Sequence, residues 1–228
     1  MFSKLMAMDD LIRNIRKDLR LAMNGVASSS MREKGMNYKM NFGVDVLRLQ
    51  QIAQKYEPSS SLAEEIWKLD VREMKILSTM IYPVDQFTKA QAKKWVNEIP
   101  NQEIREHLCR NLLQNLPFAH ELVKQWTLNA NPSIRLTGYW LYTRLMLIGS
   151  DALQKIENPP IIKQALQDVD LNLNILRTAA LNVLRHLIRA NKEDAEKIMS
   201  QIAHFSNSDN TIQKEIFDSL KFEFEFRG

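Results

Sequence analysis

Apolar residues recur at spacings of three and four along most of the chain, which predicts helices with one buried face. The clearest case follows Asn131, which can cap a helix. Pro132 suits the first helical position, and an apolar run then extends to about Leu147. The helices expected from this pattern cover residues 1–24, 45–56, 62–69, 70–81, 88–96, 101–113, 131–147, 161–169, 173–190 and 193–205, with one more around 122–126 and a last one after residue 210.

A basic residue stands near the start of five of these helices. A cation is not favoured by the helix dipole at that end, so a tertiary contact or a ligand must explain it. The five residues follow one another at intervals of 30, 30, 42 and 37: Lys75, Arg105, Arg135, Arg177 and Lys214. Units of about 30–45 residues, each a helix pair, are typical of an α-solenoid. The predicted fold is therefore an all-α superhelix, a HEAT-like repeat solenoid forming one domain over residues 1–228.

Two stretches depart from the helical pattern. Residues 25–39 contain three consecutive serines and Gly35, and we expect a loop there. Residues 222–226 alternate between Phe and Glu, which resembles a strand, yet the chain offers no strand to pair with it. The segment 222–228 is thus expected to be either the end of the last helix or a tail that docks elsewhere. No stretch has a βαβ pattern, which excludes a Rossmann fold.

Composition limits the function classes. The net charge of +4 and the pI of about 9.1 allow a nucleic-acid partner without requiring one. Cys109 is the sole cysteine, so no intramolecular disulfide forms, in keeping with a cytoplasmic location. No apolar run approaches 18 residues and the N-terminus is charged, so we expect neither a membrane span nor a signal peptide. The four histidines share no metal-binding spacing, and no metal or other cofactor is expected.

The first predicted helix is amphipathic. Its apolar stripe runs through Leu5, Leu11, Ile12, Ile15, Leu19 and Met23, and its basic residues are Arg13, Arg16, Lys17 and Arg20. The basic side is either a solvated face of a packed helix or a lip beside a DNA groove.

A further set of motifs comprises Asn41-Phe42-Gly43-Val44, residues 46–48, residues 62–69, Arg72-Glu73, residues 95–113 and residues 131–142. Together these motifs resemble the AlkD-like DNA alkylation repair family, and the resemblance covers residues 31–217. It implies a curved stack of HEAT-like helix pairs whose basic concave face holds duplex DNA. Active members are glycosylases that release cationic N3- and N7-alkylpurines without flipping the damaged base into a pocket, using tryptophans, an aspartate and an arginine.

The resemblance carries over to this chain only in part. The family's arginine matches Arg135, and its aspartate falls at Glu106, the candidate catalytic residue. Two family tryptophans fall at Gln102 and Asn182, and a family tyrosine falls near Lys34, with Tyr38 as a substitute after a shift. The charged half of the site is therefore retained and the aromatic half is lost.

This difference matters for catalysis. Cleavage of an alkylpurine develops positive charge on the sugar, which a nearby carboxylate stabilises and tryptophans pack against. The longer side chain of Glu106 changes the position of the carboxylate by about an ångström, which is enough to cost orders of magnitude in rate. We therefore expect any glycosylase activity to be weak, altered in substrate or absent.

The periodic cations and the family resemblance together predict a duplex-DNA-binding protein. The predicted DNA-binding residues are Arg135, Lys75, Arg105, Arg177, Lys214 and Lys39. The alternative for these cations is a structural bond between neighbouring repeats. Two other functions stay open: a scaffold that binds a protein partner along its solenoid, and an active glycosylase in which Tyr38, Tyr139 or Tyr142 replaces the missing rings. The tryptophans Trp67, Trp95, Trp126 and Trp140 are expected in the core, and Glu106 is as readily a solvated carboxylate.

Overall fold

The computed structural model describes the backbone of residues 2–226 and the side chains of residues 8–226. Within this part of the chain the secondary structure is helical, and no strand forms beyond one isolated bridge between Met40 and Val71. The helices group into two compact units, residues 1–116 and 117–228. We describe each unit by itself; that the chain folds as a single domain stays a prediction.

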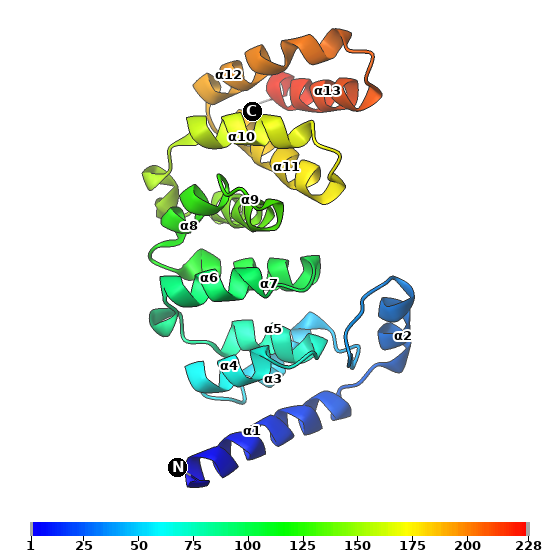
Figure 1. The fold of residues 1–228 in the computed structure, drawn as a ribbon, viewed down its shortest axis with the longest axis vertical. Coiled ribbons are helices and arrows are strands. Elements are labelled where there is room, and N and C mark those ends of the chain that lie inside the picture. The colour runs from blue at the N-terminus through cyan, green and yellow to red at the C-terminus, as the bar shows by residue number, and fades with distance from the viewer. Residues whose placement is uncertain (1, 227–228) are drawn as a thin grey trace. The chain divides into compact units, whose positions relative to one another are not determined.

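The first unit begins with a long helix and continues with shorter ones (Figure 1). Its α-helices are α1 (Phe2–Leu21), α2 (Gly25–Glu33), α3 (Val46–Ala53), α4 (Ser60–Trp67), α5 (Arg72–Ile81), α6 (Lys89–Asn97) and α7 (Gln102–Asn111), with short 3-10 helices η1 (Val84–Gln86) and η2 (Leu113–Asn115). Helix α5 packs against α3, α4 and α7, and α1 packs against α3 and α4. Thr88 and Asn101 are the N-caps of α6 and α7, since each side chain accepts a backbone N–H of its own helix.

The core of the first unit is aromatic. The rings of Trp67 and Trp95 stack in parallel with centroids 4.0 Å apart, and Tyr82 and Phe87 contact Trp95 and each other edge-on. Trp67 and Trp95 are 2% and 0% exposed, which confirms that they belong to the core. Such offset and edge-on pairs stabilise a core beyond the area that they bury.

The second unit is a regular series of helix pairs. Its α-helices are α8 (Ala119–Trp126), α9 (Pro132–Leu147), α10 (Asn158–Val169), α11 (Asn174–Ala190), α12 (Lys192–Ile202) and α13 (Thr211–Glu225), with short 3-10 helices η3 (Asp151–Lys155) and η4 (Ala203–Asn207). Each even-numbered helix pairs with the next, and α9, α11 and α13 pack in succession. Gly138 lets α8 and α9 approach closely, because a Cβ there would lie 2.5 Å from the backbone nitrogen of Thr127. Trp126 is buried in this unit and Trp140 is partly exposed.

Three expectations need correction or completion. Residues 25–33 form helix α2, not a loop, because Asn24 caps the helix and Ser28 is buried against the carbonyl of Asn41. Met23 does not lie on the buried stripe of α1 but is 61% exposed, whereas Ile15 and Leu19 are fully buried; Leu5 lies outside the described side chains.

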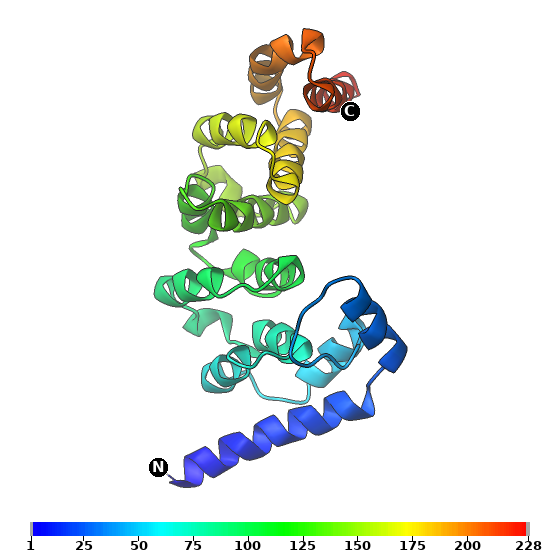
Figure 2. The same cartoon turned by 45° about the vertical axis from the view of Figure 1, so that its right-hand side comes forward.

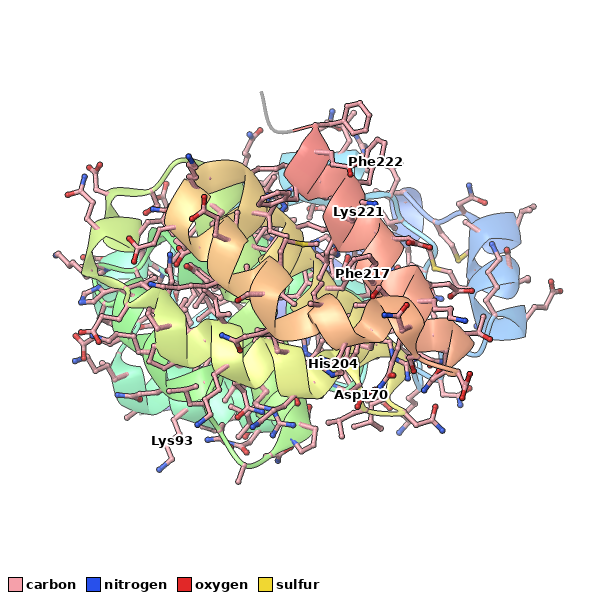
Figure 3. All side chains as sticks on the ribbon, turned by 90° about the horizontal axis from the view of Figure 1, so that it is seen from above. Lys93, Asp170, His204, Phe217, Lys221 and Phe222 are labelled. Atoms are coloured by element: carbon pink, nitrogen blue, oxygen red, sulfur yellow. The ribbon has the colours of Figure 1, made fainter. Side chains whose placement is uncertain are left out.

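The alternating segment after residue 221 continues helix α13 to Glu225, so the expectation of a helix end is confirmed there. The rings of Phe222 and Phe226 lie 4.6 Å apart at this end, and Figure 3 shows Phe222 projecting from the helix. Residues 227 and 228 lie outside the described residues.

Candidate nucleic-acid interface

The five periodic cations share one position in the fold. Lys75, Arg105, Arg135, Arg177 and Lys214 are each the fourth residue of their helices, α5, α7, α9, α11 and α13. We call them the fourth-position cations. Their shared register confirms the repeat inferred from their spacing.

Two fourth-position cations, Lys75 and Arg177, bind the C-terminal end of the helix that precedes their own. The ammonium of Lys75 donates to the carbonyl of Trp67, the last residue of α4, at 2.6 Å and lies 4.9 Å from its ring centroid. Arg177 donates to the carbonyls of Val169, the last residue of α10, at 3.1 Å and of Leu171 at 2.6 Å. The carbonyl of the last residue of a helix has no partner within that helix, and a cation there also interacts favourably with the negative end of the helix dipole.

Arg135 makes the most extensive set of these contacts. Its guanidinium donates to both carboxylate oxygens of Asp168 at 2.9 and 2.8 Å, and to the carbonyls of Asn129 and Ala130 at 2.8 and 3.0 Å. Asp168 is 0% exposed and also accepts the hydroxyl of Tyr139 at 2.7 Å. Burial, together with this bond to a carboxylate, raises the pKa of Tyr139, so the phenol stays protonated. Arg135 therefore joins α9 to α10 and the loop after α8.

Glu106 and its neighbours form a small polar chain at the start of α7. The side-chain amide of Gln102 accepts from the guanidinium of Arg105 at 2.7 Å and donates to the carboxylate of Glu106 at 3.0 Å. Arg105 is 6% exposed, and burial lowers its pKa. Glu106 is partly exposed, so the candidate catalytic carboxylate faces an amide at the position where the family resemblance leads one to expect a tryptophan.

The tyrosines proposed as substitutes for the missing rings are not available on the surface. Tyr139 and Tyr142 are 0% and 1% exposed, and their hydroxyls donate to Asp168 and Asn158. Tyr38 is 9% exposed, and its hydroxyl lies 3.4 Å from Glu103. Tyr139 and Tyr142 therefore fill the core of their unit and do not offer a ring to a ligand in the place of the missing tryptophans. Asn182 is partly exposed and accepts from Arg185.

The remaining predicted cations differ from the buried ones. The side chains of Lys39 and Lys214 are exposed, and neither has a hydrogen bond or ion pair within residues 8–226. DNA contact by any of the six predicted residues stays a prediction, but only these two are accessible without first leaving a partner.

The most accessible group of cations lies on α1. Arg13, Arg16, Lys17 and Arg20 follow the spacing i, i+3, i+4 and i+7, which places them on one side of the helix, and all four are exposed. We call this set the α1 cationic face. Arg13 bonds Asp10 at 2.9 Å, whereas Arg16, Lys17 and Arg20 have no partner within the described side chains. The sequence pattern identified this face, but the predicted DNA-binding residues omitted it.

The excess positive charge lies at the N-terminal end of the chain. Residues 1–116 contain 18 basic and 14 acidic residues, whereas residues 117–228 contain 13 of each. Within the first unit, residues 1–39 alone hold 8 basic and 4 acidic residues, so the rest of the chain is neutral overall. The segment of the sequence that contains α1 therefore accounts for the net positive charge of the chain.

Two other site classes find no support among the described residues. In that part of the chain no three His, Cys, Asp or Glu side chains gather as metal ligands. None of the described helices is both long and apolar enough to cross a bilayer.

Comparisons with known proteins give one family match and one fold match over most of the chain. The family model described as DNA alkylation repair enzyme matches residues 15–146, more than half of the chain. A solved structure described as a new family of proteins related to the HEAT-like repeat DNA glycosylases with affinity for branched DNA structures is similar over 94% of this chain and 96% of its own, with a TM-score of 0.71 and 14% identity. This likeness confirms the all-α, HEAT-like repeat solenoid.

Two further comparisons concern a designed repeat protein and curated protein sequences. A designed armadillo repeat protein in complex with a (KR)4 peptide matches 95% of this chain and 93% of its own, with a TM-score of 0.47 and 14% identity. No curated protein sequence matches the chain.

Proposed function

Because the chain belongs to the DNA alkylation repair enzyme family, we propose that it binds DNA and that the α1 cationic face supplies the principal phosphate contacts. The observation that carries this proposal is the exposure of Arg16, Lys17 and Arg20, which have no acidic partner among the side chains of residues 8–226. An unpaired cation on a surface can release the counterions of a phosphate without first breaking a bond. The family's partner and the position of the excess charge thus agree.

The fourth-position cations contribute in a different way. Arg135 would leave Asp168 as a buried, unpaired carboxylate if it turned toward a phosphate, and such a charge is costly. We therefore assign Arg135, Lys75 and Arg177 to the stability of the repeats. Lys39 and Lys214, which are exposed, are assigned to secondary phosphate contacts.

We propose that glycosylase activity is weak or absent. The carboxylate of Glu106 accepts from Gln102, and the tyrosines Tyr139 and Tyr142 lie in the core, so no ring replaces the expected tryptophans. Without an aromatic surface to hold the sugar and the cationic base, the substrate is not positioned next to the carboxylate, so the carboxylate alone contributes little to catalysis. Base release from N7-methylguanine duplex tests this: we expect no release above the uncatalysed rate, and efficient release that Glu106→Gln abolishes would contradict it.

DNA binding itself is tested by comparing two matched triple variants. One neutralises the α1 cationic face, Arg16→Gln with Lys17→Gln and Arg20→Gln. The other neutralises three exposed cations of the second unit that have no partner within the described residues, Lys124→Gln with Lys155→Gln and Lys163→Gln. At low salt we expect the α1 variant to bind duplex DNA about tenfold or more weakly and the second variant to bind like the parent. Equal losses would show that only total charge matters.

The kind of DNA is a finer part of this proposal. The related solved structure is described as having affinity for branched DNA, so the binding assay includes a four-way junction beside a linear duplex. A groove in the second unit supports a second candidate function, binding of a protein partner. It is lined by Pro132, Leu136, Leu173 and Ile175, and the last two are 46% and 57% exposed on a unit without net charge. Absence of DNA binding at low salt would favour this scaffold function.

A further inference from the structure

The corner between α1 and α2 presents three exposed apolar side chains. Leu21 is 75% exposed, Met23 61% and Val26 83%. Isolated apolar residues are common on protein surfaces, whereas three within six residues concentrate exposed apolar side chains at one corner, where a partner could cover them. The corner directly follows Arg20, the last residue of the α1 cationic face, and Figure 2 shows α2 turning away from the end of α1.

The backbone at this corner is held in place by the loop that follows α2. The amide of Asn24 donates to the carbonyl of Phe42 at 2.9 Å, and the hydroxyl of Ser28 donates to the carbonyl of Asn41 at 2.8 Å. Gly43 has a φ of +69°, and a Cβ there would lie 2.2 Å from the carbonyl oxygen of Asn24. The loop therefore packs directly against the backbone of the corner, and only glycine permits this contact.

A buried ionic network fixes the loop in turn. Glu73 is 0% exposed, and its carboxylate accepts the amides of Phe42 and Val44 at 3.1 and 3.3 Å. Arg72 donates to the carbonyl of Val44 and to Glu73, both at 2.9 Å, and binds Glu103 on α7 through a forked contact of 2.7 and 3.0 Å. Contacts of this type are strong and directional. The exposed patch is thus displayed on a corner that is anchored to α5 and α7.

We propose that this corner is an apolar wedge that contacts unstacked bases at a DNA branch point while the α1 cationic face holds the adjoining phosphates. The inference rests on the proposed DNA binding, including its branched-DNA part, and adds to it the side chains that contact the branch. In a continuous duplex the faces of the bases are covered by stacking, whereas a junction or flap exposes some of them. Proteins insert side chains such as Leu and Met at such steps, where they unstack or kink the duplex.

Two features of the corner favour this occupant. The cations next to the patch suit a polyanion, because Arg16, Lys17 and Arg20 have no acidic partner within the described side chains. The anchored backbone lowers the entropy that is lost when the wedge engages, since little remains to be ordered.

The test compares binding to an immobile four-way junction and to a linear duplex of the same arm sequence. The corner variant carries Leu21→Ser, Met23→Ser and Val26→Ser; the control carries Leu147→Ser, which changes a 57% exposed leucine of the second unit. We expect the parent and the control to prefer the junction. We expect the corner variant to lose about tenfold of that preference, because water then replaces an apolar contact, and to bind the duplex as the parent does.

Other outcomes overturn the inference in distinguishable ways. A parent that binds both DNAs equally, or a corner variant that retains the preference with an unchanged melting temperature, refutes the wedge but leaves DNA binding intact. A parent that binds neither DNA refutes the proposed function itself. A parent that sediments as a dimer, with the corner variant a monomer, would assign the corner to a second copy of the chain.

Discussion

The α1 cationic face and the fourth-position cations show that basic residues have two different roles in this chain. Arg16, Lys17 and Arg20 are exposed and lack partners within the described side chains, whereas Arg135 makes four hydrogen bonds and is 8% exposed. The first group does not repeat along the sequence, and the second recurs in five helices. Three of the five recurring cations, Lys75, Arg135 and Arg177, therefore bond a neighbouring element, whereas the cations of α1 are exposed to a ligand.

The two units differ in the same way. The unit of residues 1–116 holds the whole positive excess of the chain, and the unit of residues 117–228 is neutral. The net attraction of the chain for a polyanion is thus contributed by its first unit. Substitutions can test whether the repeat cations stabilise the fold while the α1 cationic face binds DNA.

The largest effect on stability is expected from Arg135→Ala. The substitution leaves Asp168 buried without its cation, and breaking such a pair costs about 3–5 kcal/mol of the free energy of unfolding. Urea unfolding measures the loss. If Arg135 instead contacted DNA, the Arg135→Ala variant would unfold like the parent and bind DNA more weakly.

A double-substitution cycle separates the ion pair from the loss of packing. Arg135→Ala combined with Asp168→Ala is expected to cost less than the sum of the two single changes, because no lone charge stays buried. Strict additivity would show that Arg135 and Asp168 are not coupled.

An intermediate effect is expected from Gly43→Ala, which attacks the support of the α1–α2 corner. A Cβ there meets the backbone of Asn24 and Ser28 at 2.2 and 2.6 Å, and φ is +69°. We expect a loss of about 2–4 kcal/mol, since steric and backbone strain add. Gly35→Ala is the matched control, because its φ is +83° but no atom lies within 4 Å. Thermal unfolding measures both variants, and the control should lose only about 1 kcal/mol. Equal losses would mean that Gly43 is needed only for its positive φ and not for the close contact with Asn24.

The smallest effect is expected from the surface pair of Arg189 and Glu223, which joins α11 to α13. The hydrogen bond from Arg189 lowers the pKa of Glu223 below its ordinary value of 4.5. The stabilisation is therefore present above pH 4.5 and is lost as the pH falls through the lowered pKa. Because the arginine side chain is 54% exposed, Arg189→Gln should cost about 0.5 kcal/mol at pH 7 and nothing once Glu223 is protonated. A cost that does not change with pH would indicate lost packing.

Much of the fold follows from local sequence. The caps at Thr88, Asn101 and Asn131 and the breaks that follow their helices are local signals, and the structure confirms them. Helix α2 was missed because three serines and a glycine have low helix propensity; its stability comes from contacts with residues 41–43, which no local pattern shows.

The site was harder to predict for a physical reason. The spacing located Arg135, but its partner Asp168 lies 33 residues away, and only the packing of α9 on α10 brings them together. An arginine on a phosphate and an arginine on a buried carboxylate look the same in a sequence. The spacing of Arg13, Arg16, Lys17 and Arg20 did predict a basic face, and that prediction needed only the helix itself.

The most direct test of the central claim is the salt dependence of duplex binding. The slope of log affinity against log salt should become shallower by about three units when Arg16, Lys17 and Arg20 are changed to glutamine, because three phosphate contacts no longer release counterions. The matched variant at Lys124, Lys155 and Lys163 should keep the slope of the parent. An unchanged slope in the α1 variant, with a loss in the variant of the second unit, would contradict the account and place the DNA-binding surface among the repeats.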